Sequence, residues 1–256
     1  MKDKSIYILA ISLFFLFTHD AISQDTGKDK YNQGVTAFKS GNFQEALQIW
    51  TDIYNTGSRS ANLNYNIGNA YFKLNEIPAA ILFFERAWLL DPSDEDTNYN
   101  LQIARTLVVD RFKEIPELFF VRWYNYISLI ITANAWSAFS LVAFILSLLL
   151  FSLYIYSSGY RFKVPGFWFA MLFFILSVSS LSFALRNKNL VYDSHKAIIS
   201  NPLVSGKSSP DNSGTDLFVL HEGTKVSIED EIGEWLEIRL SDGNKGWVPV
   251  NCLNII

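Results

Sequence analysis

Two long apolar runs dominate the pattern of hydrophobic and polar positions along the chain. Residues 135–156 and 166–185 contain no charged side chain, and each run would cross a hydrocarbon layer of about 30 Å as a helix rising about 1.5 Å per residue. Residues 157–165 between the runs are too few for a domain. The pattern predicts a transmembrane helical hairpin with a short loop, which leaves both flanking regions on the same side of a membrane.

A repeating pattern occupies residues 24–115. Gly34 recurs as Gly68, and Ala46 recurs as Ala80 at the same spacing. Small residues at fixed positions allow paired helices to cross closely, and a period of about 34 residues is typical of stacked helical hairpins. We therefore expect an all-α region built from short helix pairs.

The second repeat carries the more specific motif, which resembles the tetratricopeptide repeat (TPR) with Asn64 in place of the usual Trp. The matching positions are Ile67, Gly68, Tyr71, Ala80, Phe84, Ala87 and Pro92. The first repeat, about residues 27–60, is more degenerate, and a third supplies a capping helix over residues 95 to about 110. The resemblance implies a TPR superhelix of about two and a half repeats.

Resemblance to TPR proteins implies a concave face that binds extended peptides or partner helices. The residues expected on this protein-binding face are Tyr31, Val35, Phe38, Lys39, Asn62, Tyr65, Asn69, Phe72 and Lys73. The alternative is that the aromatic members simply pack between helices. In TPR proteins that clamp a C-terminal carboxylate, Lys and Asn occupy set positions; here Asn66 fits but Tyr31, Val35 and Asp96 do not, which argues against that specificity.

Alternating apolar and polar positions, interrupted by turns, begin at residue 197. The stretches "DLFVL", "TKVSIEDE" and "EWLEIRL" have the period of β-strands, and Glu222-Gly223 and Asp242-Gly243 supply turn residues. Residues 197–256 are therefore predicted to form a small all-β barrel, joined to the hairpin by a linker over residues 186–196. Residues 205–214, rich in Ser, Gly, Pro and Asn, are expected to be a mobile loop.

The combination of "EGTKV", "EWLEI" and "GWVP" resembles the bacterial Src homology 3 (SH3b) family. The resemblance implies an SH3-like groove formed by Trp235, Trp247 and Pro249. The alternative for both tryptophans is packing in the core of the barrel. Eukaryotic relatives bind proline-rich segments, but the N-terminal tyrosine-rich motif of those relatives is missing here, so the sequence gives weak support for a proline-rich ligand.

Residues 116–134 precede the first apolar run and contain Arg122 within an aromatic-rich pattern. One interpretation is an interfacial segment with Phe119, Phe120, Trp123 and Tyr126 at the level of the lipid headgroups. The other is that the segment lengthens the first membrane span by packing against the second. The sequence does not separate the two.

Residues 1–23 have the features of a signal peptide. Lys2 and Lys4 precede an uncharged apolar run over residues 5–17, and the small residues Ala21 and Ser23 suit cleavage after Ser23. An uncleaved anchor is the alternative. The basic residues around the hairpin do not decide its orientation. A signal peptide would place the TPR and SH3-like regions in the periplasm, the loop 157–165 in the cytoplasm, and the spans in a bacterial inner membrane.

Composition and the positions of Cys and His limit the kinds of function that the chain can have. The chain is 50% hydrophobic with a net charge of −4 and no long run of either sign, which argues against a nucleic-acid partner. Cys252 is the sole cysteine, and His19, His195 and His221 have no spacing typical of a metal site or catalytic triad. We therefore expect no catalytic residues, metal or cofactor, and a protein that is not an enzyme.

The order of signal peptide, TPR units, two spans and SH3-like barrel resembles the BatE family of the aerotolerance (Bat) operons. The resemblance implies an inner-membrane protein that works with von Willebrand A domain Bat proteins. We expect a non-enzymatic membrane-anchored adaptor that holds partners through two binding modules. The alternative is a cell-wall sensor whose barrel binds peptidoglycan, and a third possibility is an enzyme subunit that contributes an active-site residue.

Overall fold

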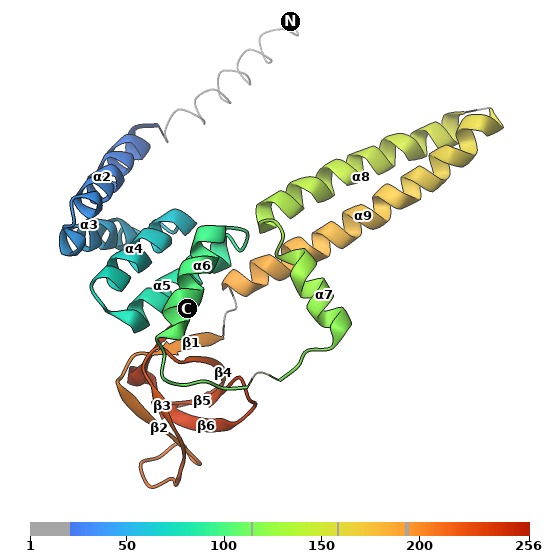
Figure 1. Cartoon of the computed structure of the whole chain (residues 1–256). Helices are drawn as coiled ribbons and strands as arrows, with labels where there is room; N and C mark the ends of the chain where they lie inside the picture. Colours follow the sequence, from blue (N-terminus) through green and yellow to red (C-terminus); the bar gives the residue numbers. More distant parts are fainter. Residues whose placement is uncertain (1–20, 114, 158, 193–194) are drawn as a thin grey trace, which may run out of the picture.

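The computed structural model describes residues 21–113, 115–157, 159–192 and 195–256. A group of short helices and a β-sheet lie together at one end of a long helical hairpin (Figure 1). The predicted signal peptide, residues 1–23, lies outside the described residues except for its last three.

Paired antiparallel helices make up the N-terminal part. They are α2 (Ala21–Lys39), α3 (Phe43–Asn55), α4 (Ala61–Lys73), α5 (Ile77–Leu90) and α6 (Glu95–Thr106). A β-carbon at Gly68 would lie 2.7 Å from the ring of the buried Phe84, and one at Gly34 would lie still closer to the ring of Trp50. The glycines are therefore required where the two helices of each pair cross.

The helix-capping residues and the left-handed turn residues also recur at the period of the repeat. Ser60 and Asp94, one period apart, accept hydrogen bonds from backbone N–H groups in the first turns of α4 and α6 and cap these helices. Gly41 and Asn75, again one period apart, have left-handed φ angles of 83° and 63° in the turn inside each helix pair. The repeat is therefore one of local geometry as well as of sequence.

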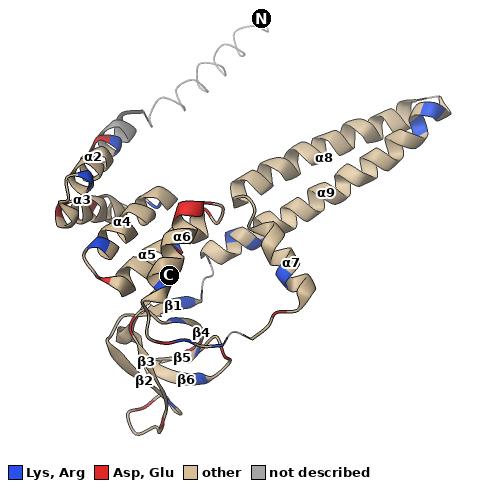
Figure 2. Cartoon of the chain, viewed as in Figure 1, with Lys and Arg blue, Asp and Glu red and all other residues tan. Residues whose placement is uncertain are grey.

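The hairpin consists of α8 (Ala133–Tyr156) and α9 (Tyr160–Tyr192). The second helix is longer than the run 166–185 that predicted it. The expected loop 157–165 is therefore helical from residue 160, and the expected linker 186–196 is helical up to residue 192. The structure corrects both boundaries, because Arg161, Lys163, Arg186 and Lys188 continue the helix at either end. Figure 2 shows Lys and Arg at the tip and at the base of the hairpin, with neither basic nor acidic residues along the helices between them.

Small residues line the contact between α8 and α9. Ser140 donates a hydrogen bond to the carbonyl of Ser177, Ser177 donates one to the carbonyl of Ser140, and Ser147 donates one to the carbonyl of Ala170. Gly166 lies against the backbone of α8. Small side chains let the two backbones approach closely, as in packed membrane helices.

A separate short helix, α7 (Phe119–Ser128), precedes the hairpin. It ends at Ser128 with Leu129 as its C-cap, and Thr132 caps the start of α8. Residues 116–134 therefore do not lengthen α8 as one continuous helix, because the helical hydrogen bonding is interrupted between α7 and α8. The segment does pack against the second span, α9, as that interpretation expected.

The C-terminal β-domain (residues 195–256) is one antiparallel sheet of order β3-β2-β6-β5-β4-β1-β7. Its strands are β1 (Lys196–Ile199), β2 (Leu203–Lys207), β3 (Asp216–His221), β4 (Lys225–Ile232), β5 (Trp235–Arg239), β6 (Lys245–Pro249) and β7 (Leu253–Ile255), and the 3-10 turn η1 is Val250–Cys252. Inward side chains such as Leu220, Ile238 and Val248 form its core. The predicted start of the loop 205–214 is wrong, because Ser205 to Lys207 belong to β2 and pair with β3.

The β-domain packs directly on the last helices of the repeats. Ile198 of β1 is buried in one cluster with Ile81 and Phe84 of α5 and Leu101 of α6. No helix follows α6 in a paired position within the described residues. The sheet therefore covers the end of the helical stack, where terminal repeats otherwise need a cap.

Residues 107–113 and 115–118 form a strap between α6 and α7 that runs along the β-domain. Phe112 packs against the core of the sheet, and the N–H of Ile115 donates to the carbonyl of Ser241 over 3.3 Å. The capping helix expected to reach about residue 110 ends at Thr106. This correction reflects contacts with the sheet, which hold the strap in place.

Candidate interaction surfaces

The first helices of the two complete repeats, α2 and α4, carry the residues predicted to form the protein-binding face. Lys39, Asn62 and Lys73 are exposed. Tyr31 and Val35 are half-buried against the core of the first repeats, as is Phe38. The face therefore offers exposed polar groups beside partly covered apolar ones.

Tyrosine and asparagine side chains join successive repeats along this face. Asn66 donates to the hydroxyl of Tyr31 over 2.7 Å, and Asn100 donates to the hydroxyl of Tyr65 over 3.1 Å. Asn69 accepts a second hydrogen bond from Asn100 at 2.9 Å. Asn66 and Asn69 are thus already engaged inside the chain, so the resemblance of Asn66 to a carboxylate-clamp asparagine has a structural explanation.

The aromatic members of the face serve packing to a large extent. Tyr65 and Phe72 pack against the cluster at the α5–α6 end of the stack. Burial raises the pKa of the Tyr31 hydroxyl, partly offset by the hydrogen bond from Asn66. These aromatic side chains therefore pack between helices, as the alternative expected. Only their exposed edges are accessible to a ligand.

The outer face of the β-domain brings the three predicted groove residues together. Trp235 on β5 lies opposite Pro249 on β6, and Trp247 on β6 lies opposite Glu237 on β5. All four are half-buried, and their neighbours along each strand, such as Leu236, point into the core. The alternative that both tryptophans fill the core is therefore wrong, because strand alternation directs them outward.

A buried ion cluster joins the repeats to the β-domain. The carboxylate of Glu85 on α5, 1% exposed, accepts from Lys225 Nζ on β4 at 2.6 Å and pairs with Arg105 on α6. Burial alone would raise the pKa of Glu85, but the two cations outweigh it and hold that pKa below its ordinary value. Sequence reasoning missed this site, although one acid within the apolar helix "IPAAILFFERAWLL" was a signal for it.

A second polar contact joins the strap to the β-domain. Asp110 accepts from the backbone N–H of His221 and from the hydroxyl of Thr224, both at 2.7 Å, and His221 Nδ1 lies 2.8 Å from its other oxygen. Burial would raise the pKa of Asp110, but these hydrogen bonds outweigh it and lower that pKa. Nothing in the sequence relates Asp110 to a turn more than a hundred positions later.

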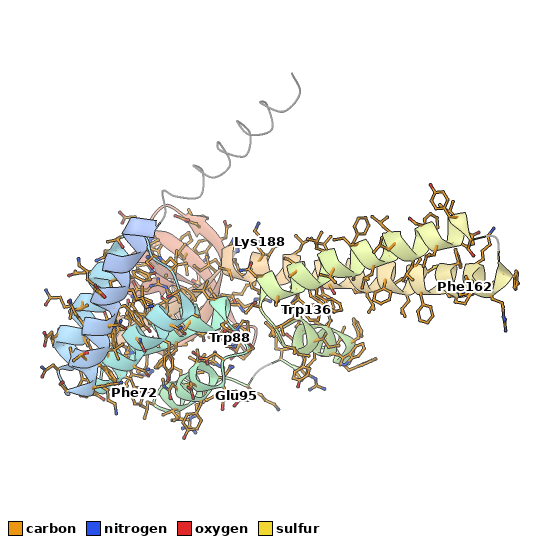
Figure 3. The ribbon with its side chains drawn as sticks, turned by 90° about the horizontal axis from the view of Figure 1, so that it is seen from above. Phe72, Trp88, Glu95, Trp136, Phe162 and Lys188 are labelled. Carbon is orange, nitrogen blue, oxygen red and sulfur yellow. The ribbon has the colours of Figure 1, made fainter. Side chains whose placement is uncertain are left out.

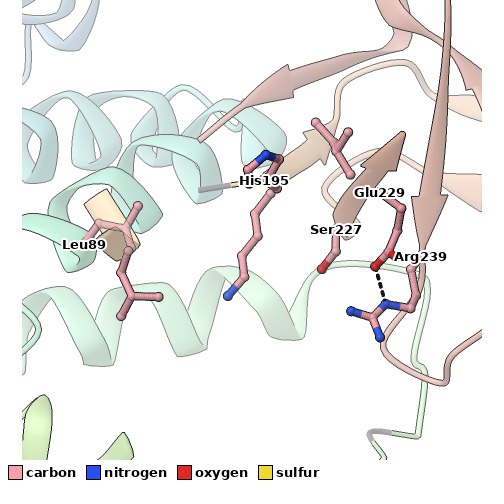
Figure 4. A pocket seen from close by; sticks show the side chains of 8 residues that line it. Leu89, His195, Ser227, Glu229 and Arg239 are labelled. Carbon is pink, nitrogen blue, oxygen red and sulfur yellow. Dashed lines mark ion pairs between the residues drawn. The ribbon is translucent and has the colours of Figure 1, made fainter. Parts of the chain in front are cut away.

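A pocket of about 230 Å³ lies where the end of α5, the end of α9 and strands β1, β4 and β5 meet (Figure 4). Its polar lining includes His195, Lys196 and Ser227, and Glu229 pairs with Arg239 at 2.7 Å. The charges of Glu229 and Arg239 offset each other within the lining.

Reactive chemistry is sparse in the part of the chain that the structure describes. No group of three or more His, Cys, Asp or Glu side chains is placed to hold a metal ion there. Burial raises the pKa of the Cys252 thiol to about 11, so it stays protonated near neutral pH and is a poor nucleophile.

Comparison with known proteins assigns the β-domain to a family. The family described as "Bacterial SH3 domain" matches residues 207–254. A "NADPH oxidase activator" of Dictyostelium discoideum is 43% identical over 58 residues, which are 23% of this chain and 9% of that protein, so the chain spans less than a tenth of this relative. A solved structure, "Crystal structure of MamA protein", covers 66% of this chain and 86% of its own at 14% identity and a TM-score of 0.31, too loose to carry an argument.

Proposed function

We propose that the chain is a non-enzymatic membrane-anchored adaptor that presents a TPR-like face and a bacterial SH3 domain as one joined unit. The observation that carries the proposal is the direct packing of the two modules at the base of an apolar hairpin. Two weak binding modules held together raise each other's effective concentration, so such a unit can keep a complex assembled without catalysis.

Support for the anchor comes from the exposure of the hairpin. Of the most apolar stretch of each helix, 17% in α8 and 22% in α9 is buried inside the molecule. Large side chains such as Leu149 and Phe174 are exposed around it. A core helix of a soluble domain would be mostly covered, whereas helices in lipid are covered by acyl chains.

The proposal places both modules in the periplasm and the tip with Arg161 and Lys163 in the cytoplasm. Support for this orientation comes from the predicted signal peptide at residues 1–23, which would direct the N-terminal helices outward. The domain order that resembles BatE adds the expected partners, membrane-associated von Willebrand A domain proteins of a Bat-type stress-resistance complex.

Photocrosslinking in the native cell tests the adaptor. A photoreactive amino acid at Lys73, exposed on the first-helix face, is expected to capture a discrete membrane-associated protein that mass spectrometry identifies. The matched control is Asp52, which is exposed on α3. Equal capture at both positions, or none at Lys73, would contradict a binding role for this face.

A second candidate function, a cell-wall sensor, is supported by the half-exposed Trp235, Trp247 and Pro249 on a bacterial SH3 domain. In detergent, the full chain would then sediment with purified sacculi, and Trp235→Ala would reduce the sedimented fraction. Capture of a protein at Lys73 without any sedimentation would favour the adaptor over the sensor.

A further inference from the structure

Helix α7 exposes a cluster of aromatic side chains outside the hairpin. Phe119, Trp123 and Tyr126 are 77%, 68% and 71% exposed, and Phe120 is 54% exposed. Steps of four and three positions place 119, 123 and 126 on one face of a helix. Such a face is costly to leave in water, so it indicates a partner surface.

The opposite face of α7 is fixed to the base of the hairpin. The hydroxyl of Tyr124 lies 2.7 Å from that of Ser182, and the Tyr124 ring packs against Phe183. Ser128 at the end of α7 is held from α9 by Arg186, whose Nη1 donates to its hydroxyl over 2.6 Å, and by Asn187, whose amide donates to its carbonyl over 2.6 Å. The aromatic face is thereby held pointing away from the hairpin.

The direction of α7 matches that of a membrane surface. Figure 1 shows it running across the hairpin axis rather than along it, beside the first turns of α8. Seen from above in Figure 3, Trp136 and Lys188 mark the base of the hairpin, Phe162 lies at the far tip, and the repeats with Phe72 and Glu95 lie beyond the base. A layer perpendicular to the hairpin would contain α7 at its boundary.

We propose that α7 lies in the headgroup region of the bilayer and binds the lipid surface through Phe119, Phe120, Trp123 and Tyr126. Aromatic rings prefer this boundary because one part meets acyl chains while the polar edge of Trp or Tyr stays hydrated. Helix α7 docks on the base of a hairpin whose own large apolar side chains, such as Leu149 and Phe174, are exposed, and this neighbourhood argues for lipid rather than for a protein groove. The inference rests on the proposed membrane hairpin. It adds that α7 would fix how far the two modules stand from the bilayer and at what angle to it.

Nitroxide depth measurements on the full chain in vesicles of phosphatidylcholine and phosphatidylglycerol test this inference. A spin label on Trp123→Cys is compared with labels on Tyr99→Cys, 66% exposed on α6, and Phe144→Cys, exposed in the middle of α8. The buried Cys252 thiol, with its pKa of about 11, stays unlabelled near neutral pH. The readout is the ratio of collisions with oxygen, which partitions into lipid, to collisions with a water-soluble nickel chelate.

The expected ratio at position 123 is several-fold above that at position 99 and below that at position 144. A ratio at 123 equal to that at 99 would overturn the inference while leaving the hairpin proposal intact. A label at 123 shielded from both reagents would indicate a protein partner and also overturn it. A water-like ratio at 144 would instead defeat the proposed membrane hairpin itself.

Arg122→Cys provides a matched control on the same helix. Arg122 is exposed beside the aromatic face rather than at its centre. A helix lying in the interface predicts a smaller ratio at 122 than at 123, whereas an unfolded or detached segment predicts equal ratios.

Discussion

Single glycine positions decide how closely the helices of each repeat cross. Gly68 faces the ring of Phe84, and no open space remains for a methyl group. The same is true of Gly34 and Trp50. By contrast, a β-carbon at Gly27 in α2 would meet nothing within 4 Å. The three glycines share a helical setting but differ in what faces them.

Gly68→Ala is expected to lower the free energy of unfolding by about 1–3 kcal/mol, because the overpacked α4–α5 crossing outweighs the better helix propensity of alanine. Gly27→Ala, the matched control, is expected to leave stability unchanged or raise it by up to about 1 kcal/mol. Denaturant unfolding of the full chain in detergent, followed by tryptophan fluorescence, checks both. Equal stability of the two variants would contradict the close crossing.

In the hairpin, a few polar side chains fix how two helices of nearly uniform apolar composition pack against each other. Its composition is nearly uniform, yet reciprocal hydrogen bonds between Ser140 and Ser177 fix one helix against the other. Such bonds are worth roughly 0.6 kcal/mol each in a membrane, so they select a register more than they supply stability. Most of the other large apolar side chains of α8 and α9 face away from this contact and are exposed.

Ser140→Cys combined with Ser177→Cys is expected to form an intramolecular disulfide under mild oxidation, because the two hydroxyl oxygens are 3.2 Å apart. Blockage of maleimide labelling on the full chain in membranes measures the yield. The control pair, Val142→Cys with Ser177→Cys, is expected to stay reduced, since Val142 is two positions from Ser140 and is exposed on the opposite face of α8. Similar yields from the two pairs would mean that the hairpin has no fixed register.

At the scale of the whole molecule, carboxylates join modules that lie far apart in the sequence. Glu85 joins α5 and α6 to β4, and Asp110 joins the strap to the turn after β3. A buried ion pair contributes little net stability compared with apolar packing, but removing one partner is costly. These contacts therefore act mainly to fix one arrangement of the two modules.

Acid is expected to loosen this junction. The pKa values of Glu85 and Asp110 are lower in the folded chain than in the unfolded chain, where they are about 4. Their contribution is therefore complete above that unfolded pKa and is lost as the pH falls through the lower folded pKa. The unfolding midpoint of the full chain should be level from pH 7 to about pH 5 and fall below that.

Glu85→Gln should remove about 3 kcal/mol of stability near neutral pH and flatten the acid slope, because the cations lose their buried counter-charge. Glu95→Gln, at an exposed position on α6, is the control and should match the unmodified chain. A steep acid slope that persists in Glu85→Gln and in Asp110→Asn would assign the transition to other groups.

The sequence by itself determined the elements whose signals are local. Apolar runs specified the hairpin helices, the repeat period specified the paired helices, and strand alternation specified most of the β-domain. The meeting of Trp235, Trp247 and Pro249 followed from the resemblance to the SH3b family. These signals need no partner from a distant segment, because helix and strand periods and turn residues act within a few positions.

Tertiary structure alone decided where these elements end and how they join. The contacts of Glu85 with Lys225 and of Asp110 with His221 span more than a hundred positions, so no local pattern could place them. The end of α6 at Thr106 depended on strap contacts with the sheet, and the outward direction of the α7 aromatics depended on Tyr124 and Ser128 docking on the hairpin. Packing and charge pairing between distant segments arise only when the whole chain has folded. Local sequence patterns extend over a few residues, so they do not show which distant segments will meet.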